Sequence, residues 1–239
     1  MPAGSGKYGD LAEWSSVAIG VLTLLVAAFG VWFARGQWNA PHDFTPELEK
    51  QYAAQLRQAY QTDLNLDPDE IKALESFTAH HKLHPDSVDA FRIELMRRMK
   101  TASQNIHRGL DLARQQRFAD ARREFLSAAK VDPENSAAWA DLGAANVELG
   151  QMDEGRNAYD KALILAPNDW RTHYNFGLFF VRVHNPDEAL VQFRQVFSPQ
   201  SSGKGLKQVL HDAETNPLLA SLRKDPRFRD LLKEAENES

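Results

Sequence analysis

The sequence predicts an all-α protein, with a single N-terminal transmembrane helix followed by an α-solenoid of three helix-turn-helix repeats and flanking capping helices. Two observations lead to this fold class. Gly109, Gly143 and Gly177 recur at a spacing of 34 residues, and a fixed period of this length is the mark of a helix-turn-helix repeat array. Residues 15–34 contain no charged side chain, and about 20 such residues are enough to cross a bilayer as a helix.

Further residue types keep the same 34-residue register between residues 102 and 201. One aromatic residue and one small apolar residue recur in each unit: Phe125, Tyr159 and Phe193, then Ala128, Ala162 and Val196. Pro133 and Pro167 end the second helices of the first two units, because proline lacks the N–H and disfavours helix at the residue before it. The three units are therefore expected to have the same helical structure.

These residues resemble the tetratricopeptide repeat (TPR) family. The second unit has the best match, with Trp139, Leu142, Gly143, Tyr159, Ala162 and Pro167. The resemblance implies that the first helices of the repeats line a concave groove for a peptide or helix of another protein. Together with the uncharged run at residues 15–34, it predicts a membrane-anchored TPR protein.

The repeated glycines also have a physical interpretation. Glycine inside a helix costs roughly 1 kcal/mol relative to alanine, so a close approach of a neighbouring helix is expected at each of the three positions. The recurring aromatic residues are expected to be knobs that pack onto small residues of the next helix.

Residues 1–35 are interpreted as a short polar tail and the transmembrane helix. Trp14 and Trp32 lie near the two ends of the uncharged run, as aromatic residues do at membrane interfaces. A buried core helix fits less well, because a core helix rarely carries about 20 uncharged and mostly apolar residues in a row. A cleaved signal peptide also fits less well, because the tail has only Lys7 as a basic side chain and Trp32-Phe33-Ala34 is too bulky for a small-residue cleavage site. The protein is thus expected in the inner cell membrane as a single-pass protein. Basic residues favour a cytoplasmic repeat domain only slightly, and the layout also resembles periplasmic assembly factors.

Residues 36–101 are expected to hold a linker and N-terminal helices, which form either a degenerate repeat or a cap. Thr45 and Pro46 have the residue types of a helix start, a second helix is expected from Pro68 to about His81, and Ser87 is expected to cap a third. Residues 202–239 resemble the segment that closes many TPR arrays, and Leu219, Leu222, Phe228 and Leu231 are expected to face inward and cover the last repeat.

No catalytic or cofactor-binding motif is found, and the protein is not expected to be an enzyme or to need a cofactor. The chain has no cysteine, and its histidine cluster at residues 80–84 is better interpreted as a surface feature than as a metal site. Residues 102–200 carry 11 basic and 13 acidic side chains, which disfavours nucleic-acid binding.

The predicted groove contains apolar or small side chains and three arginines. By register its residues are Ile106, Leu110, Arg114, Ala137, Ala140, Ala144, Val147, Arg171, Tyr174, Leu178 and Arg182. The arginines suggest a partner with an acidic and apolar helix or tail, although pairing with the chain's own acids is an equally good interpretation. The predicted function is a protein-interaction scaffold or assembly factor. The alternative is a structural or accessory subunit of a membrane complex.

Overall fold

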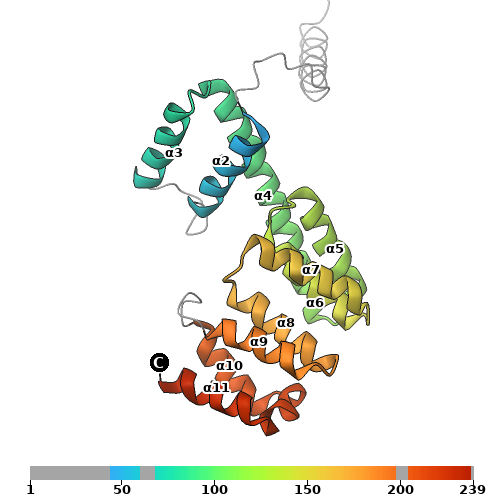
Figure 1. Ribbon diagram of the computed structural model, residues 1–239. Coiled ribbons are helices and arrows are strands. Elements are labelled where there is room, and N and C mark those ends of the chain that lie inside the picture. Colours follow the sequence, from blue (N-terminus) through green and yellow to red (C-terminus); the bar gives the residue numbers. More distant parts are fainter. Residues whose placement is uncertain (1–43, 60–67, 198–203, 238–239) are drawn as a thin grey trace, which may run out of the picture. The chain divides into compact units, whose positions relative to one another are not determined.

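The computed structural model describes residues 44–59, 68–197 and 204–237, all of whose regular secondary structure is helical. Within these ranges the chain forms two compact units, divided between Arg92 and Ile93 (Figure 1). None of the helices in the described ranges has the length and apolar character needed to cross a membrane. The uncharged run at residues 15–34 lies outside those ranges.

The N-terminal unit contains helix α2 (Pro46–Ala59), helix α3 (Pro68–His80) and the first turns of helix α4 (Pro85–Arg114). The backbone N–H of Leu48 donates to Thr45 Oγ1 at 3.3 Å, which confirms Thr45 as the cap of α2. Tyr52 is 1% exposed and lies at the centre of an aromatic cluster with Phe44, Phe77 and Phe91.

The start of α4 differs from the prediction that Ser87 caps the third helix. The helix begins at Pro85, three residues before the predicted first residue Val88, and the missing N–H of proline is no loss in a first turn. The N–H of Val88 donates to the carbonyl of His84 at 3.1 Å, so Ser87 lies within the first turn. The helix then continues without a break to Arg114, where it forms the first helix of repeat 1.

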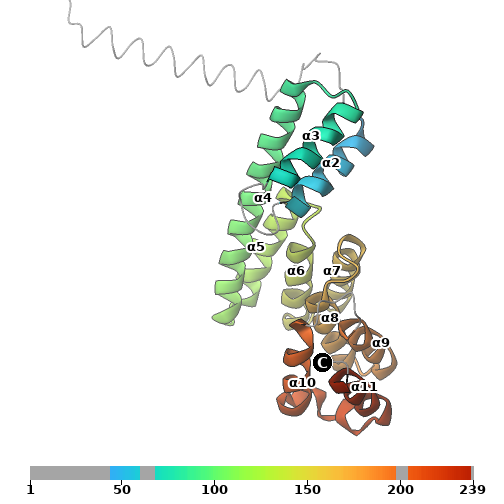
Figure 2. The same ribbon diagram turned by 90° about the vertical axis from the view of Figure 1, so that its left-hand side faces the viewer.

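The C-terminal unit confirms the predicted array of TPR-like helical repeats. Helices α4 and α5 (Phe118–Val131) form repeat 1, α6 (Ser136–Glu148) and α7 (Met152–Leu165) form repeat 2, and α8 (Trp170–Arg182) and α9 (Pro186–Val196) form repeat 3. The second helices begin at Phe118, Met152 and Pro186, which keep the register of the repeated glycines. The helices of each pair lie side by side, as do successive pairs (Figures 1 and 2).

The three repeated glycines lie directly under the three repeated aromatic rings. A Cβ atom added at Gly109 would stand 2.5 Å from the ring of Phe125, and one at Gly143 would stand 3.0 Å from the ring of Tyr159. The predicted close approach is therefore confirmed. Its direction differs from the expectation, because each ring packs back onto the first helix of its own repeat.

Turn geometry also follows the repeat. Gln116, Gly150 and His184 occupy equivalent positions directly after the first helix of each repeat, and all three have positive φ angles, of 60°, 76° and 58°. Only the glycine at this position adopts such a conformation without steric cost. The second helices α5 and α7 end at Val131 and Leu165, just before Asp132-Pro133 and Ala166-Pro167, as the prolines predict.

The segment after repeat 3 forms a fourth helical pair. Helix α10 (Lys204–Thr215) begins one repeat spacing after α8, and the short 3₁₀ helices η2 (Pro217–Ala220) and η3 (Leu222–Lys224) connect it to α11 (Pro226–Asn237). The four predicted inward-facing residues are buried, with Leu219 and Phe228 both 0% exposed. The Phe228 ring lies 5.5 Å from that of Phe193, so this pair covers the end of repeat 3 as expected.

Candidate protein-binding surface

The first helices of the repeats carry the side chains predicted to line a groove. On α6 the residues Ala137, Ala140, Asp141, Ala144 and Glu148 follow a helical spacing of three and four, so they form one stripe. The register places equivalent stripes on α4 and α8. We refer to these three stripes together as the first-helix face; its members are Ile106, Leu110 and Arg114 on α4, the five residues on α6, and Arg171, Tyr174, Leu178 and Arg182 on α8.

Burial divides the predicted residues into three groups. Arg114, Ala137 and Arg171 are exposed; Ile106, Leu110, Ala144, Leu178 and Arg182 are half-buried; Ala140, Val147 and Tyr174 are buried. Val147 belongs to the interior of repeat 2, where a Cβ added at Gly155 would meet its methyl group at 2.7 Å. The side chains available to a partner on this face are thus mainly Ala137, Ala144, Leu178 and the arginines.

Two of the three arginines pair with acids of the chain itself. The Arg182 Nη2 donates to Glu148 Oε1 at 2.9 Å and so joins the first helices of repeats 2 and 3. The Arg114 Nη1 donates to Asp111 Oδ1 at 2.5 Å within α4. The Arg171 guanidinium lies 5.0 Å from the centre of the Trp170 ring. Arg171 is therefore the arginine of this face whose charge has no acidic partner among the described residues.

Tyr174 is held by the fourth helical pair. Its hydroxyl donates to Asp212 Oδ2 on α10, and its side chain is 8% exposed. Burial and this hydrogen bond raise the pKa of the Tyr174 hydroxyl above its ordinary value. Around Tyr174 the first-helix face is consequently in contact with α10.

Asp141 is a polar residue of this face that the predicted set does not include. It is half-buried on α6, with neither a hydrogen bond nor an ion pair to any described residue. Burial, with a smaller effect of the Asp169 carboxylate, raises the pKa of the Asp141 carboxyl to about 7. Its helical spacing from Ala137 and Ala144 could have identified it, and the 34-residue spacing could have identified Glu148 as a neighbour of Arg182.

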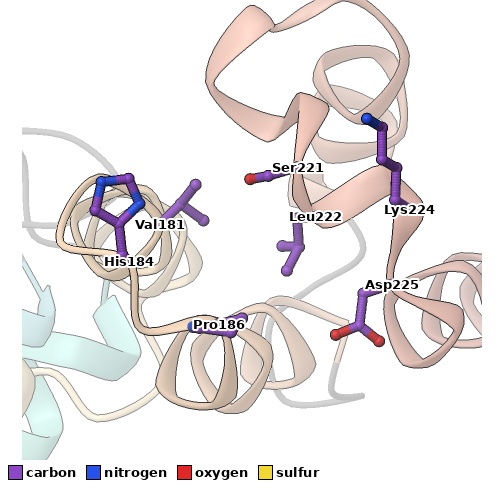
Figure 3. A pocket seen from close by; sticks show the side chains of 7 residues that line it. All are labelled: Val181, His184, Pro186, Ser221, Leu222, Lys224 and Asp225. Carbon is purple, nitrogen blue, oxygen red and sulfur yellow. The ribbon is translucent and has the colours of Figure 1, made fainter.

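A separate hollow of about 430 Å³ lies at the turn between α8 and α9. Figure 3 shows Val181 and Leu222 near its centre, with His184 and Lys224 on opposite sides. Asp225, at the same hollow, already accepts hydrogen bonds from Arg227. This hollow contains no residue of the predicted groove. No group of three or more side chains that could hold a metal ion occurs in the described ranges.

Comparisons with known proteins agree with the repeat architecture. The tetratricopeptide repeat family model matches residues 107–169. The Hsp70-Hsp90 organizing protein 1 of Glycine max is 26% identical over 125 residues, which are 52% of this chain and 20% of that protein. The chain thus spans about a fifth of the length of this relative.

Two solved structures of the Yersinia enterocolitica type III secretion translocator chaperone SycD are also similar. Each is 16% identical to this chain with a TM-score of 0.38, and the match covers 58% of this chain. It covers 94% of the chain in one SycD structure and 86% in the other. Residues 107–169 thus match the tetratricopeptide repeat model, and helical pairs continue in the same 34-residue register through α9.

Proposed function

We propose that this protein is a membrane-anchored interaction scaffold or assembly factor, and that it binds a helix or peptide of another protein on the first-helix face. The observation that carries the proposal is the composition of that face. It keeps small and apolar side chains accessible at Ala137, Ala144 and Leu178, next to the exposed guanidinium of Arg171.

The residue types of this face suit an amphipathic helix. Small side chains such as Ala137 and Ala144 allow a partner backbone to come close, and Leu178 offers an apolar contact. Arg171 can hold a carboxylate of the partner with two parallel hydrogen bonds. Arg114 and Arg182 contribute less, because their charges are already neutralised by Asp111 and Glu148.

The name of the Glycine max relative refers to the chaperones Hsp70 and Hsp90. Some TPR proteins hold chaperone tails with a clamp that includes an asparagine after the repeat glycine. Here Leu110, Ala144 and Leu178 follow Gly109, Gly143 and Gly177. We therefore expect a partner other than a chaperone tail.

The anchor of the scaffold is proposed to be the uncharged run at residues 15–34, with the repeats leaning to the cytoplasmic side. The support is the sequence alone, since about 20 uncharged residues in a helix match the thickness of the hydrocarbon core. Carbonate washing of membranes tests the anchor. The full-length chain should stay in the pellet and a variant lacking residues 1–35 should not, whereas release of both would contradict the anchor.

The binding face is tested by placing a large charged side chain on its most accessible small residue. Ala137→Arg should abolish recovery of the partner in affinity purification from mild detergent, with little effect on folding because Ala137 is exposed. Asn157→Arg is the matched control, as Asn157 is exposed on α7 of the same repeat. Equal recovery with both variants would remove the first-helix face as the binding surface. A stoichiometric set of membrane subunits that survives both changes would favour the structural-subunit function instead.

A further inference from the structure

The second helices of repeats 2 and 3 differ at three equivalent positions. In α7, Arg156 and Asp160 form an ion pair at 3.9 Å across one turn, with the exposed Asn157 beside them. The equivalent positions one repeat later, in α9, are Leu190, Arg194 and Val191. The ion pair of repeat 2 is thus replaced by an apolar residue and a lone arginine in repeat 3.

The apolar residues at these positions are accessible. Val191 is 52% exposed, although its equivalents Asn157 and Arg123 in the other repeats are polar and exposed. Leu190 is half-buried and packs against the core of the unit. Because two repeats fold with polar residues at the Val191 position, packing does not explain an exposed valine there.

A hollow of about 640 Å³ opens beside Val191, between α9 and α11. The half-buried Leu190 and the largely buried Leu231 line this hollow with further apolar atoms. The hollow has the size range of ligand-binding pockets in proteins, and its α9 residues recur every three or four positions, so it follows the helix axis. An extended or helical segment with a large apolar side chain could seat that side chain here.

The charges at the two ends of this hollow differ in their pairing. At one end Arg227 is saturated, because its Nη1 donates to Asp187 Oδ1 and its Nη2 to Asp225 Oδ2, both at 2.7 Å. At the other end the Arg194 guanidinium has no hydrogen bond or ion pair with any described residue. An accessible guanidinium beside an apolar surface favours a carboxylate that arrives with the partner.

We infer that the surface formed by Val191, Leu190, Leu231 and Arg194, between α9 and α11, is a second protein-binding site. Its partner is a segment of another protein that carries an apolar side chain and a carboxylate about one helical turn apart. The apolar side chain enters the hollow beside Val191, and the carboxylate pairs with Arg194. This site lies on second helices of the array and does not use the first-helix face.

Photo-crosslinking of the full-length chain in its own membrane tests the inference. A benzoylphenylalanine replaces Val191 in one variant and Asn157 in a matched variant, which is the same position one repeat earlier. The cross-linked peptide is then sequenced by mass spectrometry. The expected result is an adduct specific to position 191, from another protein, with an acidic residue about one helical turn from the cross-linked position.

The cross-linked segment is next synthesised with a fluorescent label and titrated against the full-length chain in detergent. Arg194→Asp should weaken binding by about tenfold, because arginine is among the residues whose loss costs an interface most. Lys130→Asp is the control, since it makes the same charge change on the exposed face of α5 and should leave the affinity unchanged. A peptide whose acidic residue is replaced by lysine should regain affinity for the Arg194→Asp variant.

Several results would overturn the inference. They are an adduct with a second copy of this chain or with lipid, an adduct yield no higher at position 191 than at position 157, and equal peptide affinity for the parent and the Arg194→Asp variant. Thermal melting of each variant confirms that it is folded. Val191→Asn supplies a second test of the affinity for the peptide, which should fall. The fold should tolerate this substitution, because asparagine already stands at the equivalent position of repeat 2.

Discussion

Gly109→Ala should destabilise the protein, whereas the same change at Gly143 should be nearly neutral. An added Cβ at Gly109 would stand 2.5, 2.7 and 2.9 Å from three ring carbons of Phe125. Attractive carbon contacts lie at about 3.5–4.0 Å, so the ring would have to retreat by about 1 Å. Phe125 is 2% exposed and packs against Ala121, Leu142, Ala145 and Ala158, which leave it little room to move.

The magnitude follows from two opposing effects. Alanine gains about 1 kcal/mol over glycine within a helix, while an extra methyl group in a filled core costs about 1–3 kcal/mol. At Gly109 the overpacking effect should win, and we expect a net loss of about 1–2 kcal/mol in the free energy of unfolding. At Gly143 and Gly177 the nearest ring atoms would be 3.0 Å away, so a shift of a few tenths of an ångström suffices and the two effects should roughly cancel.

Chemical denaturation of the full-length chain in mild detergent measures all three variants. A second change, Phe125→Leu, should make Gly109→Ala less harmful, because a smaller side chain gives the methyl group room. The two changes should therefore be non-additive in a double-mutant cycle. Equal stability of the three Gly→Ala variants, or a more stable Gly109→Ala variant, would refute the argument that ring proximity sets the cost.

Four further outcomes are expected. Gln116→Gly should raise the free energy of unfolding by up to about 1 kcal/mol, and Gly150→Ala should lower it by about 1 kcal/mol. Both positions have positive φ angles, which only glycine adopts without steric cost. Thermal melting that shows the reverse signs would contradict this reason. Tyr159→Ala should cost roughly 3–5 kcal/mol in denaturation experiments, since a buried ring is lost; an unchanged midpoint would mean that the ring is not part of the core. Tyr174→Phe should lower stability by about 1 kcal/mol through loss of the hydrogen bond to Asp212, and an unaltered melting curve would show that the bond contributes nothing. Asp141→Asn should stabilise the protein at pH 8 by on the order of 2 kcal/mol and much less near pH 4. The pKa of the Asp141 carboxyl in the folded state, about 7, lies above the ordinary 3.8, so the parent protein loses stability as pH rises through that range. A gain in stability that is independent of pH would exclude this cause.

The repeat register could be read from the sequence because it depends on packing. A glycine and an aromatic residue, such as Gly109 and Phe125 in repeat 1, must appear together in each repeat, because the ring needs a neighbour without a side chain. The helix ends at Val131 and Leu165 were equally predictable, because the next residues, Asp132 and Ala166, each precede a proline. Such requirements act on residue type and recur wherever the packing recurs.

The charges of the candidate surfaces were less predictable, because an ion pair depends on rotamers and on which acid lies within reach. The sequence left open whether Arg182 faces a partner or an acid of the chain, and its pairing with Glu148 appears only in the structure. The positive φ angle at Gln116 also gave no local signal, because glutamine does not favour this conformation, and a single histidine at position 184 is only a weak signal for it. Comparison with Gly150 in the 34-residue register would have indicated both positions.

Equivalent positions in the repeats separate what the fold requires from what a binding site adds. Trp139 and His173 are different residues at equivalent positions, yet each places a ring nitrogen 2.8 Å from the carbonyl of the proline six residues earlier. Repeats 2 and 3 therefore keep a ring N–H at this position and supply it in two ways, whereas repeat 1 has Asn105 there, which donates to Ser127 instead. The bond of His173 to the proline carbonyl also indicates that Nε2 of His173 carries a proton. Asn157 and Val191 are also different residues at equivalent positions of the same helical backbone, but here nothing in the packing requires the valine. The fold consequently does not account for the apolar side chain at Val191, whereas a bound partner accounts for it.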